Sequence, residues 1–221
     1  MSYREDEHQA SRSSVTQSDK AAGCYCCDQR KAVSTRRAAQ PGVSDPKKDK
    51  EAMILFLDYD GVLHPDSAYL VRGRPVLRAT GSLFMWAEPL SSLLVDHPHI
   101  QIVLSTSWAR ELGYARARKY LPEVLSTRTV GSTWHSAMAI NANGDYRLRS
   151  RDTWWDQATR YQQIKRYVDR AHLVDWIAVD DNPEGWSDSD CHRVVRTDPE
   201  RGLSDPESVA RLSASLVGPW I

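Results

Sequence analysis

Two aspartates that could do chemistry together follow directly after an uninterrupted apolar run. Met53 to Leu57 read MILFL, and Asp58 and Asp60 come next within Asp-Tyr-Asp-Gly. Two carboxylates about 4 Å apart at an effective dielectric near 20 repel each other by roughly 4 kcal/mol. A divalent cation, which prefers oxygen ligands, would reverse that repulsion. The spacing therefore favours a metal-assisted reaction, while an ordinary acidic turn after a strand is the alternative.

Two further apolar runs also end in polar side chains. The polar residues after these runs are Ser105, Thr106 and Ser107 after Ile100 to Leu104, and Asp180 and Asp181 after Trp176 to Val179. Short continuous apolar runs are typical of strands buried on both faces of a parallel sheet. Because ligands bind outside the carboxyl ends of such strands, we expect the three polar groups to converge in one crevice.

These three segments resemble the motifs of the haloacid dehalogenase (HAD) superfamily. Its first motif is an apolar strand ending in Asp-x-Asp-Gly-Thr/Val, which DYDGV at Asp58 to Val62 matches. Its second ends in Thr or Ser, as IQIVLSTSW does from Ile100 to Trp108, and its fourth ends in an acidic pair, as WIAVDD does from Trp176 to Asp181. The resemblance covers about residues 53 to 221. It implies a three-layer, Rossmann-like α/β domain with a mostly parallel sheet.

The resemblance also implies an activity, which is Mg²⁺-dependent hydrolysis of a phosphoester. Asp58 would attack phosphorus to form an aspartyl-phosphate, and Asp60 would protonate the leaving oxygen and later activate water. Mg²⁺ would be held by Asp58, the backbone carbonyl of Asp60 and Asp180. Asp181 would act through water or orient its neighbour.

The second motif offers three hydroxyl side chains for the transferred phosphoryl group. We favour Thr106 for this contact, with Ser105 close behind and Ser107 as a further substrate contact. Hydrogen bonds from such hydroxyls would stabilise charge on the equatorial phosphoryl oxygens.

The third motif of the superfamily is only a Lys or Arg upstream of the fourth. Lys165, within YQQIKRYV, is the best candidate, with Arg160 and Arg166 as rivals. Apolar residues recur at helical spacing in this region and predict a helix over Asp156 to Arg170. Lys165 adjoins the apolar face of that helix.

The segment after the first motif is expected to form a flap. Two short β-rich runs, 69 to 71 and 76 to 77, flank Arg72, Gly73, Arg74 and Pro75, which is a hairpin pattern. In HAD enzymes this segment covers the active site, so the resemblance places Arg72 and Arg74 near the crevice. Guanidinium groups there could bind substrate phosphates bidentately, and solvated turn arginines are the alternative.

No separate domain of ordinary size fits between the second and fourth motifs, although Asn143-Gly144 is a hairpin signal. The chain therefore resembles HAD proteins without a large cap, whose open sites go with large substrates or with capping by a partner. It is most similar to the HAD domain of bacterial Swiss-army-knife RNA-repair proteins, which also reads DGVLHP. RNA or DNA end phosphates are thus the expected substrates. The alternatives are a small-molecule or nucleotide phosphatase and a non-catalytic HAD-like binding or phospho-acceptor module.

The first part of the chain differs in composition from the rest. Residues 1 to 50 contain no Leu, Ile, Phe or Trp, and all eight Trp follow Met53. Such a segment cannot offset its ordering entropy by burial. We therefore expect a disordered tail over residues 1 to 52 and a HAD-like domain over 53 to 221.

Charge and hydropathy exclude two classes of partner. The 29 Lys and Arg balance 29 Asp and Glu, which argues against a broadly basic protein that binds nucleic acid without specificity. No apolar stretch approaches the length of a bilayer, so we expect a cytoplasmic protein with no membrane partner. Cys24, Cys26 and Cys27 do not have the paired spacing of a zinc site.

Overall fold

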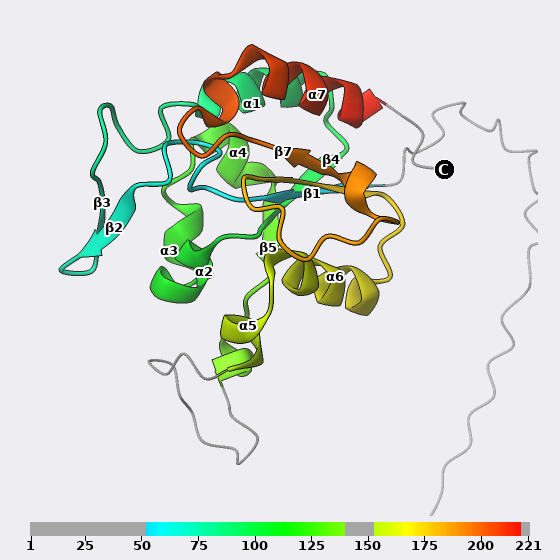
Figure 1. Ribbon diagram of the computed structural model, residues 1–221, viewed down its shortest axis with the longest axis horizontal. Helices are drawn as coiled ribbons and strands as arrows, with labels where there is room; N and C mark the ends of the chain where they lie inside the picture. The colour runs from blue at the N-terminus through cyan, green and yellow to red at the C-terminus, as the bar shows by residue number, and fades with distance from the viewer. Residues whose placement is uncertain (1–51, 140–152, 218–221) are drawn as a thin grey trace, which may run out of the picture. The chain divides into compact units, whose positions relative to one another are not determined.

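The computed structural model describes residues 52–139 and 153–217, and within them a five-stranded sheet runs through the domain (Figure 1). Its strands, in the spatial order β5-β4-β1-β6-β7, are β5 (Thr129–Ser132), β4 (Ile100–Leu104), β1 (Met53–Leu57), β6 (Trp176–Asp180) and β7 (Val194–Arg196). All four neighbouring pairs are parallel. The predicted α/β fold is confirmed. The tail expected over residues 1 to 52 and the Asn143-Gly144 turn fall outside the described residues, apart from Ala52.

The central position of β1 follows from its sequence, because all five of its residues are apolar and buried. β1 pairs with β4 on one side and with β6 on the other, with Leu57 opposite Leu104 and Val179. One residue further on, the same register places Asp58 between Ser105 and Asp180. Three strands that end in polar residues therefore deliver those residues to one edge of the sheet.

Helices cover both faces of the sheet, which gives the three predicted layers (Figure 1). The α-helices are α1 (Ala87–Val95), α2 (Ser107–Leu112), α3 (Tyr114–Arg118), α4 (Glu123–Arg128), α5 (Trp154–Gln157), α6 (Arg160–Ala171) and α7 (Pro206–Val217). Short 3₁₀ turns are formed by η1 (Ser136–Ala139), η2 (Cys191–Arg193) and η3 (Gly202–Ser204). No helix in the described ranges is long and apolar enough to cross a bilayer. Between β4 and β6 the described residues form helices and β5, with no large cap domain.

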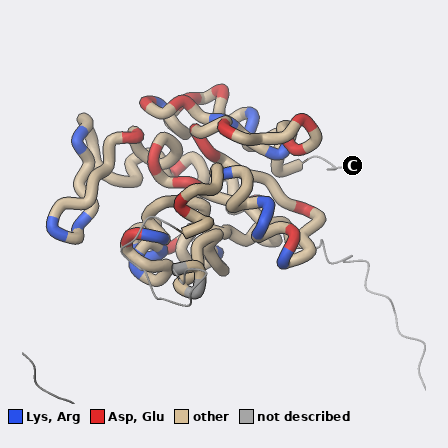
Figure 2. Tube along the Cα trace, turned by 60° about the horizontal axis from the view of Figure 1, so that its bottom comes forward, with Lys and Arg blue, Asp and Glu red and all other residues tan. Residues whose placement is uncertain are grey.

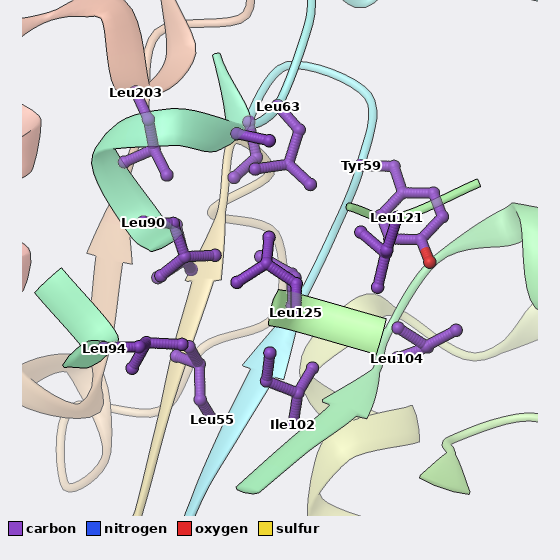
Figure 3. Packing of buried hydrophobic residues seen from close by; sticks show 14 of the residues in the cluster. Leu55, Tyr59, Leu63, Leu90, Leu94, Ile102, Leu104, Leu121, Leu125 and Leu203 are labelled. Atoms are coloured by element: carbon purple, nitrogen blue, oxygen red, sulfur yellow. The ribbon is translucent and has the colours of Figure 1, made fainter. Parts of the chain in front are cut away.

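Alternate residues of β1 pack on opposite faces. Leu55 and Leu57 belong to the larger apolar cluster, which includes Leu90 and Leu94 of α1 and Leu125 of α4 (Figure 3). The smaller cluster joins the other face of β1 to α6 through Phe56 and Ile164. Full burial of one such side chain stabilises the fold by about 1.5–3 kcal/mol. The core therefore holds β1, and with it the first motif, from both sides.

The expected flap is present as a separate hairpin (Figure 1, left). β2 (Ala68–Val71) and β3 (Arg74–Leu77) pair antiparallel, and Arg72 and Gly73 form the turn with φ angles of 50° and 75°. Two positive φ angles in succession are typical of a tight hairpin turn. A two-stranded hairpin is marginally stable alone. Here Arg116 of α3 donates a hydrogen bond to the Gly73 carbonyl over 3.1 Å, which ties the flap turn to the domain.

Candidate active site

Three carboxylates from two strand ends form an acidic cluster. One oxygen each of Asp58, Asp180 and Asp181 lie within 4.8 Å of one another. Asp58 and Asp180 are 3% and 1% exposed, and Asp181 is half-buried. The cluster opens into a cavity of about 380 Å³, which we call the acidic cavity. It is lined by Asp58, Asp60, Asp66, Ser107, Arg160, Asp181, Asn182 and Pro183.

Gly61 allows the first and fourth motifs to approach this closely. Its φ angle is +68°, a conformation that side chains with a Cβ rarely adopt. A Cβ built at Gly61 would also lie 2.6 Å from Cγ of Asp181. The glycine of Asp-x-Asp-Gly is therefore required both for the turn and for the position of Asp181.

The cluster carries more negative charge than its burial favours. Desolvation raises the pKa of Asp58 well above its usual value, the charges of Asp180 and Asp60 add to the effect, and Arg160 opposes it. Desolvation and the charge of Asp180 raise the pKa of Asp181 to about 6. Desolvation also raises the pKa of Asp180, again against the influence of Arg160. A bound cation would stabilise the ionised form of each of these carboxylates.

Arg160 is the cation that the fold brings to the cluster. Its Nη2 donates a hydrogen bond to Asp58 Oδ2 over 2.9 Å, and its Nε lies 3.0 Å from Asp180 Oδ2. Thr159 caps α6 by a reciprocal capping box with Gln162, so the helix begins at Arg160 rather than at Asp156 as expected. The first turn of α6 thereby bridges the first and fourth motifs.

Lys165, the candidate that the sequence favoured for the third-motif cation, lies away from the acidic cluster. Lys165 is 41% exposed and pairs with Asp169 at 3.2 Å. It lies on another face of α6, because five residues at about 100° each place it about 140° around the helix from Arg160. Arg166, the other rival, stacks over the ring of Trp154 at 4.3 Å.

The three hydroxyl residues of the second motif have different surroundings. Thr106 is fully buried, and its Oγ1 caps α2 by accepting a hydrogen bond from the Trp108 N–H over 3.4 Å. Ser105 Oγ is buried and has no hydrogen-bond partner among the described residues. Ser107 is exposed and lines the acidic cavity. Of these three hydroxyl residues, Ser107 lines the acidic cavity, whereas Ser105 and Thr106 are both buried.

The flap arginines lie outside the lining of the acidic cavity. Arg72 and Arg74 are exposed at the hairpin turn, and neither lines the acidic cavity. The hairpin at the left of Figure 2 carries several basic positions. The flap instead contributes apolar residues to a second cavity of about 70 Å³, which we call the flap cavity. It is lined by Asp60, Ala68, Tyr69, Leu70, Pro75, Ser107, Trp108, Glu111 and Leu112. Asp60 and Ser107 thus face both cavities.

Two residues that contact Asp60 were not assigned to the site from the sequence. The indole Nε1–H of Trp108 donates to Asp60 Oδ2 over 2.9 Å, and His64 Nε2 lies 3.1 Å from Asp60 Oδ1. A Trp that follows a buried strand is more often a core residue than a contact in a site. The signal that could have marked them is their position, directly beside the first and second motifs.

The donor set of the acidic cluster fits a hard divalent cation such as Mg²⁺. Such ions prefer carboxylate and carbonyl oxygens, and the three clustered side chains supply only carboxylates. Asp180 Oδ2 is buried without a hydrogen bond, since the Nε–H of Arg160 approaches it without the direction of one. This oxygen therefore retains the acceptor capacity that a metal ligand needs.

We expect the metal-free protein to lose stability as pH rises from about 4 to about 6. The pKa of Asp181 is about 6 in the folded protein against a usual value of 3.8, so the native state binds more protons than the unfolded state in this range. The free energy of unfolding then falls with rising pH, by an amount that solvent screening reduces because Asp181 is half-buried. Mg²⁺ should stabilise the protein more at pH 7.5 than at pH 5, because protons compete for its ligands.

Thermal melts in EDTA and in Mg²⁺ at both pH values measure this effect. Asp181→Asn is the matched variant. In EDTA, the difference between its melting midpoint and that of wild type should be more positive at pH 7.5 than at pH 5. Equal Mg²⁺ shifts at the two pH values would contradict a carboxylate metal site.

Comparison with known families agrees with this geometry. The family model described as the HAD domain in Swiss Army Knife RNA repair proteins matches residues 54–208, which include all three strand ends of the site. Searches of curated proteins and of solved structures gave no match. The matched family implies a function of the phosphohydrolase type. The chain belongs to the family of HAD domains found in Swiss Army Knife RNA repair proteins.

Proposed function

We propose that the domain is a Mg²⁺-dependent phosphoester hydrolase that works through an aspartyl-phosphate at Asp58. The observation that carries the proposal is the buried carboxylate of Asp58, which lines the acidic cavity and is held at both of its oxygens. Its Oδ1 accepts the Tyr59 N–H over 2.7 Å, and its Oδ2 accepts from Arg160. A nucleophile fixed in this way is aligned for attack before the substrate arrives.

The reaction has two steps. In the first, a carboxylate oxygen of Asp58 forms a bond to phosphorus, the bond from phosphorus to the leaving oxygen breaks, and Asp60 gives that oxygen a proton. In the second, Asp60 takes a proton from water, the water oxygen bonds to phosphorus, and the bond to Asp58 breaks. Inorganic phosphate is released, and both aspartates return to their initial state.

The remaining residues of the site hold charge in place. Arg160 favours the ionised form of Asp58 against its desolvation and donates to equatorial phosphoryl oxygens, and the hydroxyls of Ser105 and Ser107 supply further donors. Asp58, the backbone carbonyl of Asp60 and Asp180 would hold Mg²⁺, and Asp181 would act through water or orient its neighbour. Bound Mg²⁺ would neutralise the negative charge on the phosphoryl group.

The proposed substrate is a phosphorylated end of RNA or DNA. The matched family is described by RNA repair, and the acidic cavity opens without a large cap among the described residues. Arg72 and Arg74 lie on the exposed flap turn, where a substrate that extends beyond the cavity can meet them. A sugar phosphate confined to the cavity cannot do so.

A 3′- or 5′-phosphorylated oligonucleotide should therefore have a higher kcat/KM than a sugar phosphate. Arg72→Ala and Arg74→Ala should raise KM for the oligonucleotide and leave KM for the sugar phosphate unchanged. KM for the oligonucleotide should depend only weakly on salt concentration, because the domain neutralises few of its phosphates. EDTA should abolish activity and Mg²⁺ restore it.

The outcomes separate the candidate functions. Higher kcat/KM for sugar or nucleotide monophosphates, with no effect of the arginine variants, identifies a small-molecule phosphatase. If no phosphoester is turned over in Mg²⁺, the domain is a binding module or a phospho-acceptor module. Incorporation of labelled phosphate at Asp58 would identify the phospho-acceptor.

A further inference from the structure

The carboxylate of Asp60 is held at both of its oxygens by the rings of two neighbouring residues. Trp108 Nε1–H donates to Oδ2 over 2.9 Å, and His64 Nε2 lies 3.1 Å from Oδ1. The side chain of Asp60 is 17% exposed, so it still faces the two cavities that it lines. Each carboxylate oxygen has two acceptor positions. Two ring donors therefore fix its orientation and leave acceptor positions open toward the cavities.

The hydrogen bonds of His64 determine which ring nitrogen donates to Asp60. The side chain of His64 is fully buried, and its Nδ1 accepts the Phe84 N–H over 3.4 Å. A ring nitrogen that accepts a hydrogen bond carries no proton, so the ring proton lies on Nε2 and points to Asp60. The backbone of Phe84 thus orients the imidazole for this contact.

Packing prevents both donor rings from turning away. Trp108 makes edge-to-face contacts with His64, Phe84 and Tyr59, with ring centroids 5.6, 5.4 and 5.5 Å apart. Phe84 also packs edge-to-face on His64 at 5.1 Å. Because the rings lock one another, the two donors hold Asp60 in one orientation rather than following its movements.

We propose that Trp108 and His64 are positioning residues that aim Asp60 at the oxygen of the leaving group. The inference rests on the proposed function, in which Asp60 transfers the proton. An alternative is that the two bonds only satisfy buried ring donors, as Trp and His commonly require. The two accounts differ in one respect: positioning for proton transfer matters most when the leaving group needs a proton.

The test compares two substrates in Trp108→Phe, which removes the indole N–H and keeps an aromatic ring. We expect kcat/KM for an alkyl phosphate, whose leaving group needs a proton, to fall about 10- to 100-fold, part of the full value of about 10² to 10⁴ for acid–base help. For p-nitrophenyl phosphate, whose leaving group departs as a stable anion, kcat/KM should change by less than about 3-fold. The parameter kcat/KM is used because it reports the step in which the leaving group departs.

Trp155→Phe is the matched control. Trp155 and Trp108 are both 6% exposed, but Trp155 Nε1 has no hydrogen-bond partner among the described residues. This variant should keep wild-type kcat/KM for both substrates. At the other donor, His64→Gln retains an N–H that can reach Asp60 and should preserve more alkyl phosphatase activity than His64→Leu.

An indole ¹H–¹⁵N spectrum tests the contact without any substrate. The signal of Trp108 is the one missing in Trp108→Phe, and Asp60→Asn should shift it more than the other indole signals. If that signal does not move, the contact is absent from the protein in solution and the inference is overturned.

The outcomes also separate the inference from the proposed function. Equal losses for both substrates in Trp108→Phe, with wild type active and dependent on Asp58, would refute positioning and leave the hydrolase assignment intact. A wild-type protein that hydrolyses no phosphoester, phosphorylated oligonucleotide ends included, would overturn both.

Discussion

Asp58→Asn is expected to abolish hydrolysis of every phosphoester while the domain remains folded. The substitution removes the nucleophile, which in covalent catalysts costs on the order of 10⁴- to 10⁶-fold in kcat. Asn keeps the volume of the side chain, and its Oδ1 can still accept the Tyr59 N–H. Steady-state kinetics, together with a circular dichroism melt, measure the two expectations.

Asp169→Asn provides the matched control for this result. Asp169 is 63% exposed and pairs only with Lys165 among the ion pairs of the described residues. Its substitution removes the same charge and should leave kcat unchanged. Activity near the wild-type level in Asp58→Asn would refute the aspartyl-phosphate mechanism.

Arg160→Ala should have the next largest effect, and Lys165→Ala should have almost none. Loss of Arg160 leaves two buried carboxylates, Asp58 and Asp180, without their cation. Breaking a buried ion pair costs about 3–5 kcal/mol of stability, and loss of a charge-stabilising donor lowers kcat about 10²- to 10³-fold. An exposed pair such as Lys165 with Asp169 contributes at most about 1 kcal/mol.

Denaturant unfolding in EDTA and kinetics in Mg²⁺ separate the two effects of Arg160→Ala. Arg160→Lys should recover only part of the stability and part of the kcat that Arg160→Ala loses, because an ammonium group cannot replace the planar guanidinium that contacts both carboxylates. A larger loss of activity in Lys165→Ala than in Arg160→Ala would restore Lys165 as the third-motif cation.

The fold and the acidic part of the site could be predicted because they depend on where the apolar runs occur and which polar residues follow them. β1, β4 and β6 are continuous apolar runs, and parallel strands in register must present their next residues at one edge. The convergence of Asp58, Ser105 and Asp180 follows from that register without knowledge of any side-chain contact.

The identity of the cation could not be predicted, because it depends on where a helix begins. The expected start at Asp156 differs from the start that Thr159 sets by capping α6. Because the helix begins at Arg160, this residue lies in the first turn beside the strand ends, whereas Lys165 lies more than one turn further along on another face. The apolar face of the helix is the same in both cases, so periodicity does not distinguish them.

The contacts of Asp60 and the position of the flap arginines were missed for different reasons. Trp108 is buried at 6% and also donates to Asp60, whereas a sequence pattern reports only that a Trp is apolar. The flap hairpin was predicted with its turn within Arg72 to Pro75, and the structure places the turn at Arg72 and Gly73. The direction in which a hairpin leaves the domain depends on tertiary contacts such as Arg116 with the Gly73 carbonyl, and no local pattern encodes it.

The central position of β1 has a consequence for the order in which the domain forms. Its two neighbours, β4 and β6, begin at Ile100 and Trp176, so both edges of β1 await segments made later on the ribosome. Long-range pairing of this kind incurs its loop-closure entropy before its contacts compensate, which makes folding slow. Asp58 meets Asp180 only when β6 docks, and the nascent chain therefore gains the acidic cluster in the same event that completes the centre of its sheet.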